Sequence, residues 1–354
     1  MTDHTICPTI SDESIDLATA NLGQILGQAV EHDSEKAAVV VWDGRCDLAL
    51  ALAEGYRRCL PEATFLEFDR TSPTSILGAF ELLLPGDLVV LIQSTSFRLD
   101  AFRIRIELFR RSLKVIEHPH LARMRGTESL VYIDALAYDR DYFRGVGGAL
   151  KARLDRARVG VIDSGGERLV FPAGFEPAKV NIGDYTGMQN IGGQYPIGEV
   201  FTESMDLEAV NGRVRISFFG DSEFNVNRPD QPITLSVTRG RVTDVIDSTP
   251  QFDQVLSDIR ADEGEVWVRE LGFGLNRAFT EERTVSDIGT FERKCGVHLS
   301  LGAKHASFNK PNIRKKTARY HVDVFAITES VVLDDEPIFG DGAWLVGGRG
   351  AAPS

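Results

Sequence analysis

The sequence has few cysteines and lacks any long apolar run. The four cysteines, Cys7, Cys46, Cys59 and Cys295, are widely spaced and form no Cys-x-x-Cys pair. This excludes a disulfide framework and a cysteine-rich zinc site, and it predicts free thiols in a reducing compartment. The longest apolar stretches, 37–42 and 88–92, are far shorter than the roughly 20 residues that span a bilayer. We therefore expect no membrane helix and no membrane partner.

Excess positive charge and a targeting signal are also missing. The net charge of −13 argues against non-specific binding to nucleic acid or anionic lipid. Residues 1–8 show no basic start followed by an apolar run, so we expect no secretory signal and a cytoplasmic location. One stretch, Lys304–Arg319, carries six basic residues and no acid. We interpret it as a solvated loop, with an anion-receiving rim for a carboxylate substrate as the alternative.

The composition is that of a globular protein with room for two domains, since 43% of the 354 residues are hydrophobic and 26% are charged. The first part alternates predicted strands (37–42, 88–93 and 113–117) with predicted helices (46–59, 75–84 and 101–111). This order is typical of a parallel sheet covered by helices. A glycine-rich phosphate fingerprint follows none of these strands, which disfavours a nucleotide-binding Rossmann domain.

The second part has a different pattern, with short strands separated by turns. A helix is predicted over 138–158, followed by strands at 159–162, 168–171, 214–219, 233–237 and 241–246, and by a helical insertion at 252–261. We predict an α/β protein with an N-terminal parallel-sheet α/β domain (1–150), a C-terminal mixed α+β metal-binding domain (151–345) and a flexible tail (346–354).

Four polar residues stand out in the C-terminal third because they lie on strand-like runs that are otherwise apolar or small. They are Glu270, His298, His321 and Asp323. Alternation along a strand sends the side chains of His321 and Asp323 to one face, where imidazole and carboxylate make a pair of metal ligands. Burying such groups costs several kcal/mol each unless they are paired or bind a cation. The pattern therefore predicts a metal site.

The same residues belong to segments with a recognisable order. Residues 195–202, 270–276, 298–302 and 321–323 resemble the aminopeptidase T (AmpS-type) metallo-aminopeptidases and their relative 2,5-dihydroxypyridine 5,6-dioxygenase. The resemblance implies that Glu270, His298, His321 and Asp323 are metal ligands. It also implies a homodimer and a small-molecule or peptide substrate.

Two departures from the peptidase pattern bear on the number of metals. The position of the first peptidase glutamate falls on Gly198, with Glu199 matching a second acid, and a peptidase tyrosine is replaced by His305. The dioxygenase branch has a histidine at what looks like the Glu270 position. The resemblance, with these departures, implies one metal ion rather than two.

Further residues are candidates for catalysis and substrate binding. His305 is a candidate general base, and Glu199 is a candidate to accept a proton or anchor a substrate amine; a loop histidine and a surface glutamate are the alternatives. Asn190, Gln194 and Tyr195, in the glycine-rich loop 187–198, are candidates for substrate binding, with a simple connection as the alternative. For His118 and His120 we prefer a surface loop to a metal-ligand pair.

The ligand set suits Fe(II) first, with Zn(II) or Mn(II) as alternatives. Such an ion acts as a Lewis acid, as the source of a hydroxide nucleophile or as a centre for oxygen chemistry, and these uses need the same ligands. We expect an Fe(II) oxygenase-type enzyme acting on a small carboxylated or aromatic substrate that enters at the domain interface. A metallo-aminopeptidase or amidohydrolase is the alternative, and a non-catalytic peptide- or ligand-binding relative is the third.

Overall fold

The computed structural model describes residues 10–97, 104–303, 308, 310 and 319–347. The chain forms two compact units, and the first of these gathers three segments of sequence. Unit 1 consists of Met1–Arg140, Gly183–Ile197 and Glu281–Val285, and unit 2 consists of Asp141–Ile182, Gly198–Thr280 and Ser286–Ser354. Each unit has its own sheet, and each is described separately below.

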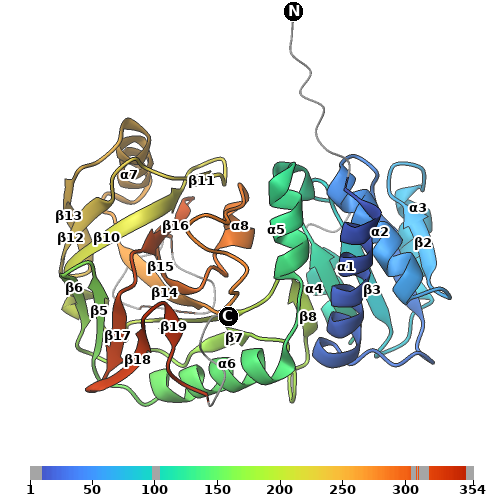
Figure 1. Ribbon diagram of the computed structural model, residues 1–354, viewed down its shortest axis with the longest axis horizontal. Helices are drawn as coiled ribbons and strands as arrows, with labels where there is room; N and C mark the ends of the chain where they lie inside the picture. The colour runs from blue at the N-terminus through green and yellow to red at the C-terminus, as the bar shows by residue number, and fades with distance from the viewer. Residues whose placement is uncertain (1–9, 98–103, 304–307, 309, 311–318, 348–354) are drawn as a thin grey trace, which may run out of the picture. The chain divides into compact units, whose positions relative to one another are not determined.

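Unit 1 is built on a parallel sheet with the strand order β2-β1-β3-β4-β8 (Figure 1). Its strands are β1 (Ala38–Trp42), β2 (Thr64–Glu67), β3 (Leu88–Ile92), β4 (Lys114–His118) and β8 (Ile191–Gln194). The central strands are continuous apolar runs because helices cover both faces of the sheet, so both sets of alternating side chains are buried.

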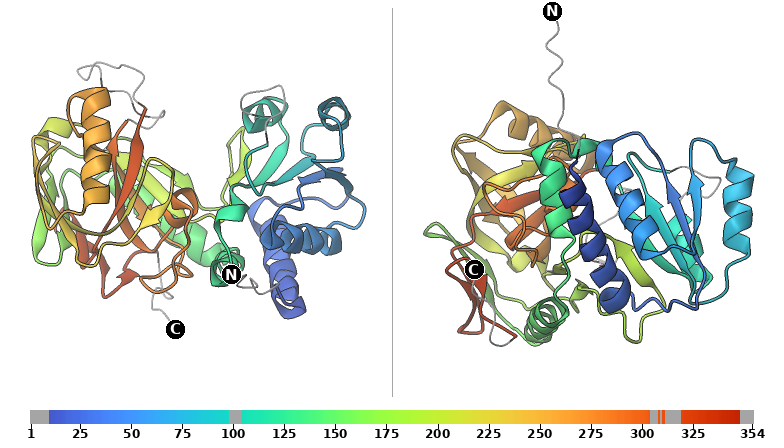
Figure 2. Two further views of the ribbon diagram at one scale, coloured as in Figure 1. Left: turned by 90° about the horizontal axis from the view of Figure 1, so that it is seen from above. Right: turned by 45° about the vertical axis from the view of Figure 1, so that its right-hand side comes forward.

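Helices lie on both faces of this sheet (Figure 2). They are α1 (Asp12–Gln24), which continues into the π-helix η1 (Ile25–Ala29), α2 (Asp47–Cys59), α3 (Pro73–Glu81), α4 (Ile104–Arg110), the short 3-10 helix η2 (Leu121–Arg123) and α5 (Thr127–Ala135). Alternate residues of β1 and β3, such as Val39 and Val89, pack with Phe80 of α3 and Leu108 of α4. That cluster forms the apolar core on one side of the sheet.

Unit 2 contains a large curled antiparallel sheet (Figure 1). Its main path runs β19-β18-β17-β5-β6-β10-β16-β15-β14-β9-β7, and β11, β12 and β13 extend from β10. The strands are β5 (Gly160–Ser164), β6 (Glu167–Phe171), β7 (Lys179–Asn181), β9 (Glu199–Glu203), β10 (Asn211–Gly220), β11 (Val226–Asn227), β12 (Ile233–Thr238), β13 (Arg241–Ile246), β14 (Val268–Gly274), β15 (Gly296–Gly302), β16 (His321–Ala326), β17 (Ser330–Leu333), β18 (Glu336–Gly340) and β19 (Ala343–Trp344).

The helices of unit 2 are α6 (Arg140–Leu154), the 3-10 helix η3 (Leu207–Ala209), α7 (Pro250–Glu263) and α8 (Ile288–Phe291). Thr249 caps α7 by accepting the N–H of Phe252, and Pro250 follows at the first helical position, where its missing N–H costs nothing. Gly264 ends the helix with a positive φ. Among all described residues, helices long and apolar enough to cross a membrane are absent.

The predicted fold class is confirmed: a parallel sheet with helices is combined with a mainly antiparallel, mixed α+β part. The prediction of a surface loop at His118 is wrong, because this residue ends β4 and is fully buried. Part of the predicted loop 187–198 is the strand β8, which pairs with β4. The stretch 348–354 of the predicted tail lies outside the described residues.

Candidate metal centre

Four neighbouring strands of unit 2, in the order β16-β15-β14-β9, bring acids and histidines to one face of the antiparallel sheet. Directly opposed residues of antiparallel strands point to the same side. Asp323 is opposite Ser300, His298 is opposite Gly272, and Glu199 is opposite Gly274. The alternate residues, including Leu299 and Val324, face the apolar core. The period-2 pattern thus separates a polar face from an apolar one.

The functional groups on this face lie close together. Glu199, Glu270 and His298 each offer a ligand atom, and these atoms all lie within 4.8 Å of one another. Nε2 of His298 is 3.3 Å from Oε1 of Glu199 and 3.9 Å from Oε1 of Glu270. Nε2 of His321 is 3.3 Å from Oδ1 of Asp323. The structure therefore combines all four predicted ligands with Glu199 on one polar face.

A glycine provides the space for the central imidazole. A Cβ placed on Gly272 would lie 2.0 Å from Nε2 of His298. No real side chain tolerates that distance, so residue 272 has to be glycine for the ring to occupy its observed position. A glycine inside a strand usually weakens it, because glycine has no side chain to pack. Here Gly272 of β14 leaves the space that the His298 side chain of β15 occupies.

An irregularity in β14 places Glu270. The register between β14 and β15 shifts between Val268 and Leu271, which is the signature of a β-bulge. Such a shift removes regular ladder partners, and the backbone N–H of Glu270 donates instead to Oγ of Ser300 at 3.0 Å. Ser300 is fully buried. Its hydroxyl therefore stabilises the backbone that presents the Glu270 carboxylate.

Several buried atoms of this group lack an aligned hydrogen bond. They are Oε2 of Glu270, both ring nitrogens of His298, and Oδ1 of Asp323. Each such atom costs about 1–3 kcal/mol if it stays without a partner. His321 is different, because its Nδ1 lies 3.1 Å from the carbonyl oxygen of Ala303. Donation to that carbonyl leaves the Nε2 lone pair free for a cation, the usual arrangement of a ligating histidine. These donors fit a divalent metal ion.

The electrostatics of the group favour charged side chains. Burial alone would lower the pKa of His298, but Glu199, Glu270 and Asp323 outweigh it and raise this pKa to about 10. Burial likewise opposes protonation of His321, yet Asp323 and Glu270 raise its pKa to about 9. Burial would raise the pKa of Glu199, but Arg293 and His298 hold it below its usual range. The carboxylates therefore attract positive charge strongly into this site.

Arg293 is a charged residue of the site that sequence reasoning missed. It follows α8, its side chain is 5% exposed, and its Nη2 lies 3.9 Å from Oε2 of Glu199. Together with the histidines, it holds the pKa of the buried Asp323 carboxyl below its usual range. One usable signal is present in the sequence, a basic residue just before the His298 strand, but the proximity of Arg293 to Glu199 depends on the fold.

Glu199 is buried on the polar face, although the sequence left a surface position as an alternative. The reading in which Glu199 is a surface residue is wrong, since only 5% of this residue is exposed. A side chain at residue 198 would meet Phe143 at 2.6 Å on a backbone with φ of +122°. Glycine is therefore required at 198, and the acid that reaches the site comes from the next position. Its catalytic role stays a prediction.

The other predicted site residues lie elsewhere or cannot be placed. His305 lies outside the described residues. Asn190, Gln194 and Tyr195 belong to unit 1, where Asn190 is exposed and Tyr195 is buried. Their role in substrate binding stays a prediction. Within the basic stretch 304–319, the described Lys310 forms ion pairs with Glu176 and Glu203.

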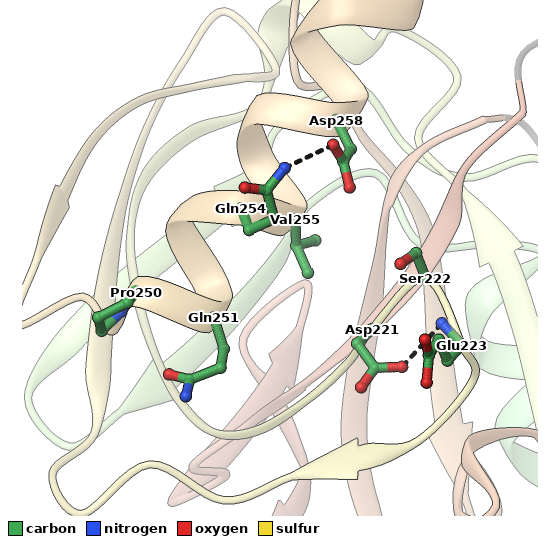
Figure 3. A pocket seen from close by; sticks show the side chains of 8 residues that line it. All are labelled: Asp221, Ser222, Glu223, Pro250, Gln251, Gln254, Val255 and Asp258. Carbon is green, nitrogen blue, oxygen red and sulfur yellow. Dashed lines mark hydrogen bonds between the residues drawn. The ribbon is translucent and has the colours of Figure 1, made fainter.

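A separate hollow of about 400 Å³ lies between α7 and the turn after β10 (Figure 3). Two of its acidic side chains have hydrogen-bond partners: Asp258 accepts a hydrogen bond from Gln254, and Asp221 accepts the N–H of Glu223. None of the predicted ligands lines it. The chemistry of unit 2 is therefore concentrated on the β9-β14-β15-β16 face.

The comparisons with known proteins concern the fold. The chain matches no protein-family model and no curated protein. Among solved structures it is similar to 2,5-dihydroxypyridine dioxygenase from Pseudomonas putida KT2440, with a TM-score of 0.60 and 15% identity over 93% of this chain and 96% of that one. It is also similar to wild-type AmpT from Thermus thermophilus, with a TM-score of 0.56 and 13% identity over 94% and 99% of the two chains. The resemblance seen in the sequence is thus confirmed at the level of the fold.

Proposed function

We propose that this chain is a metal-dependent enzyme that binds one divalent ion, Fe(II) first, on the polar face of unit 2. One observation carries the proposal: His298, His321 and Asp323 lie on adjacent antiparallel strands, and both ring nitrogens of His298 and Oδ1 of Asp323 are buried without an aligned hydrogen bond. Two histidines and one carboxylate with open positions are the ligand set of non-haem Fe(II) oxygenases. Zn(II) and Mn(II) are the alternative ions.

A bound ion supplies Lewis acidity and, if it is iron, a redox centre. The chain's own residues hold the reactants around it. The Nδ1–H of His321 is fixed by Ala303, which orients the ring. Glu199 and Glu270 are placed to accept a proton from a substrate hydroxyl or from water, because both are buried beside His298. The burial of the face limits access of bulk water and strengthens these electrostatic interactions.

The proposed substrate is a small carboxylated or aromatic molecule. The name of the solved dioxygenase states that 2,5-dihydroxypyridine is its substrate. Hydroxylated pyridines and hydroxylated aromatic acids are therefore the first compounds to test. Assembly as a homodimer is a further part of this proposal.

A metallo-aminopeptidase or amidohydrolase is the second candidate. It is favoured by the number of carboxylates, since Glu199 and Glu270 add two acids to the His298, His321 and Asp323 set. Hydrolysis uses such an acid to remove a proton from the attacking water. The similarity in fold to AmpT agrees with this candidate as well.

Metal content and oxygen uptake test the proposal together. After anaerobic loading with Fe(II), elemental analysis should find about one ion per chain, and a hydroxylated pyridine or aromatic acid should cause oxygen uptake. Cleavage of aminoacyl anilides by the Zn(II) or Mn(II) form, without oxygen uptake by the iron form, would favour the hydrolase. A protein that retains no divalent ion would instead be a binding protein.

His321→Ala tests the assignment of the ligands. This variant should lose the bound ion and the activity together, because Nε2 of His321 faces the site. His120→Ala is the matched control, since His120 contacts Ser96 in unit 1. Full metal occupancy in His321→Ala would overturn the site.

A further inference from the structure

We infer that Arg293 is a built-in positive charge that limits the metal site to a single divalent ion. The inference rests on the proposed metal site and states how many ions it accepts. Three carboxylates, from Glu199, Glu270 and Asp323, contribute to the polar face. One divalent ion together with one guanidinium balances these three formal charges.

The position of Arg293 is fixed by its own surroundings. Nη1 donates to the carbonyl oxygen of Gly289 and contacts the carboxylate of Glu292, and Nη2 lies 3.9 Å from Oε2 of Glu199. The Glu292 side chain is 21% exposed, so solvent screens it more than it screens Glu199, which is 6% exposed. The guanidinium therefore pairs with Glu292 and also acts on the buried Glu199.

A second divalent ion needs carboxylates that are not already neutralised. Nη2 of Arg293 lies 3.9 Å from Oε2 of Glu199, so the guanidinium already places positive charge beside this buried acid. An additional ion at Glu199 would meet the guanidinium at short range in a buried site, where repulsion between like charges is weakly screened. An arginine cannot relieve that repulsion by losing its proton. The guanidinium therefore takes the place that a second cation would need, and the site accepts one divalent ion.

Substitution of Arg293 and measurement of bound metal test this role. Arg293→Gln keeps a donor for the Gly289 carbonyl but removes the charge. We expect the wild-type protein to retain one Mn(II) or Zn(II) per chain after equilibration with excess metal, and Arg293→Gln to retain two. Arg293→Lys should retain one, because it keeps the charge.

The matched control is Arg269→Gln. Arg269 is another buried arginine of unit 2, and its Nε pairs with Glu203 at 2.6 Å. This variant should still retain one ion per chain. A general loosening of unit 2 would change both arginine variants alike, whereas the proposed role changes only Arg293→Gln.

The outcomes separate the inference from the proposed function. If the wild-type protein retains no ion, the proposed metal site fails. If the wild-type protein and Arg293→Gln both retain one ion with the same affinity, the metal site stands and the role of Arg293 is refuted. If Arg293→Gln is unfolded without metal, excess Mn(II) should restore its circular dichroism, because the second ion replaces the lost charge. Failure of this restoration overturns the inference as well.

Discussion

At the scale of single residues, the candidate site depends on the lack of a side chain at Gly272. His298 occupies the space over Gly272, where a Cβ would lie 2.0 Å from Nε2. The strand could adapt only by moving the imidazole, because the glycine backbone is paired on both sides, with β15 and with β9. A methyl group at this position therefore acts on the His298 ring of the candidate metal site more than on the sheet.

Gly272→Ala should abolish metal binding while leaving a folded protein. The added methyl displaces the His298 ring, and a ligand displaced by 1 Å or more no longer completes the site. Isothermal titration with Mn(II) or Zn(II) measures the loss. Gly148→Ala, in α6 with no atom within 4 Å of the added Cβ, is the control. It should bind metal normally and gain up to about 1 kcal/mol of stability. Normal metal affinity in Gly272→Ala would contradict this account.

At the scale of secondary structure elements, the bulge in β14 needs Ser300 from β15. The hydroxyl of Ser300 accepts the buried N–H of Glu270 at 3.0 Å. In Ser300→Ala this N–H has no acceptor, which costs about 1–3 kcal/mol of unfolding free energy. Urea unfolding measures the loss. Ser236→Ala, at a half-buried position of β12, should change stability by less than about 0.5 kcal/mol. Equal effects of the two substitutions would show that Ser300 does not support the bulge.

The strands and helices that have a clear pattern of apolar residues could be predicted from the sequence. Contacts between strands could not, because they depend on the register in which the strands pair. The apolar runs 38–42 and 88–92 are strands, and the alternation in His321-Val-Asp323 does place the two candidate ligands on one face. Helix α1 has no counterpart among the predictions, because its buried residues are only Ala18, Asn21 and Leu22. This narrow stripe is too weak to indicate a helix by periodicity.

The contributions of Glu199, Gly272 and Arg293 could not be read from the sequence for a physical reason. Glu199 and Gly272 act across strands that are distant in sequence, so their effect depends on which residue lies opposite which. A shift of one residue in register sends a side chain to the other face. Gly198 and Glu199 differ by that one residue, and only the backbone at 198 decides which of the two positions can carry the acid.

At the scale of the whole molecule, the two units contain different buried histidines. In unit 1, Nε2 and Nδ1 of His118 lie 2.8 Å from the hydroxyl oxygens of Tyr56 and Tyr132. Tyr132 donates to the carbonyl of Tyr195, so its oxygen accepts from Nδ1–H, and Nε2 accepts from Tyr56. The neutral ring satisfies this chain of hydrogen bonds. Burial lowers the pKa of His118 to about 3.

Acid should therefore destabilise unit 1 through His118. The folded-state pKa is below the unfolded value of 6.5, so the unfolded chain binds the additional proton. The stabilising contribution is complete above pH 6.5 and is lost as the pH falls toward 3. At pH 5 the loss is about 2 kcal/mol. Hydrogen exchange should show this loss in α2, β4 and α5, which hold the network.

Removal of metal should act on the other unit, because the proposed ligands His298, His321 and Asp323 lie on β15 and β16 and the neighbouring acids Glu199 and Glu270 on β9 and β14. An ion at 100 times its dissociation constant adds about 2.7 kcal/mol of stability, which a chelator removes. Exchange should then rise in those strands at neutral pH, while α2, β4 and α5 stay protected. His118→Gln should abolish the acid sensitivity of unit 1 and leave the chelator response intact. If the chelator increased exchange only in unit 1, the metal would bind outside the proposed site. If His118→Gln kept the acid sensitivity of unit 1, that sensitivity would come from another titratable group.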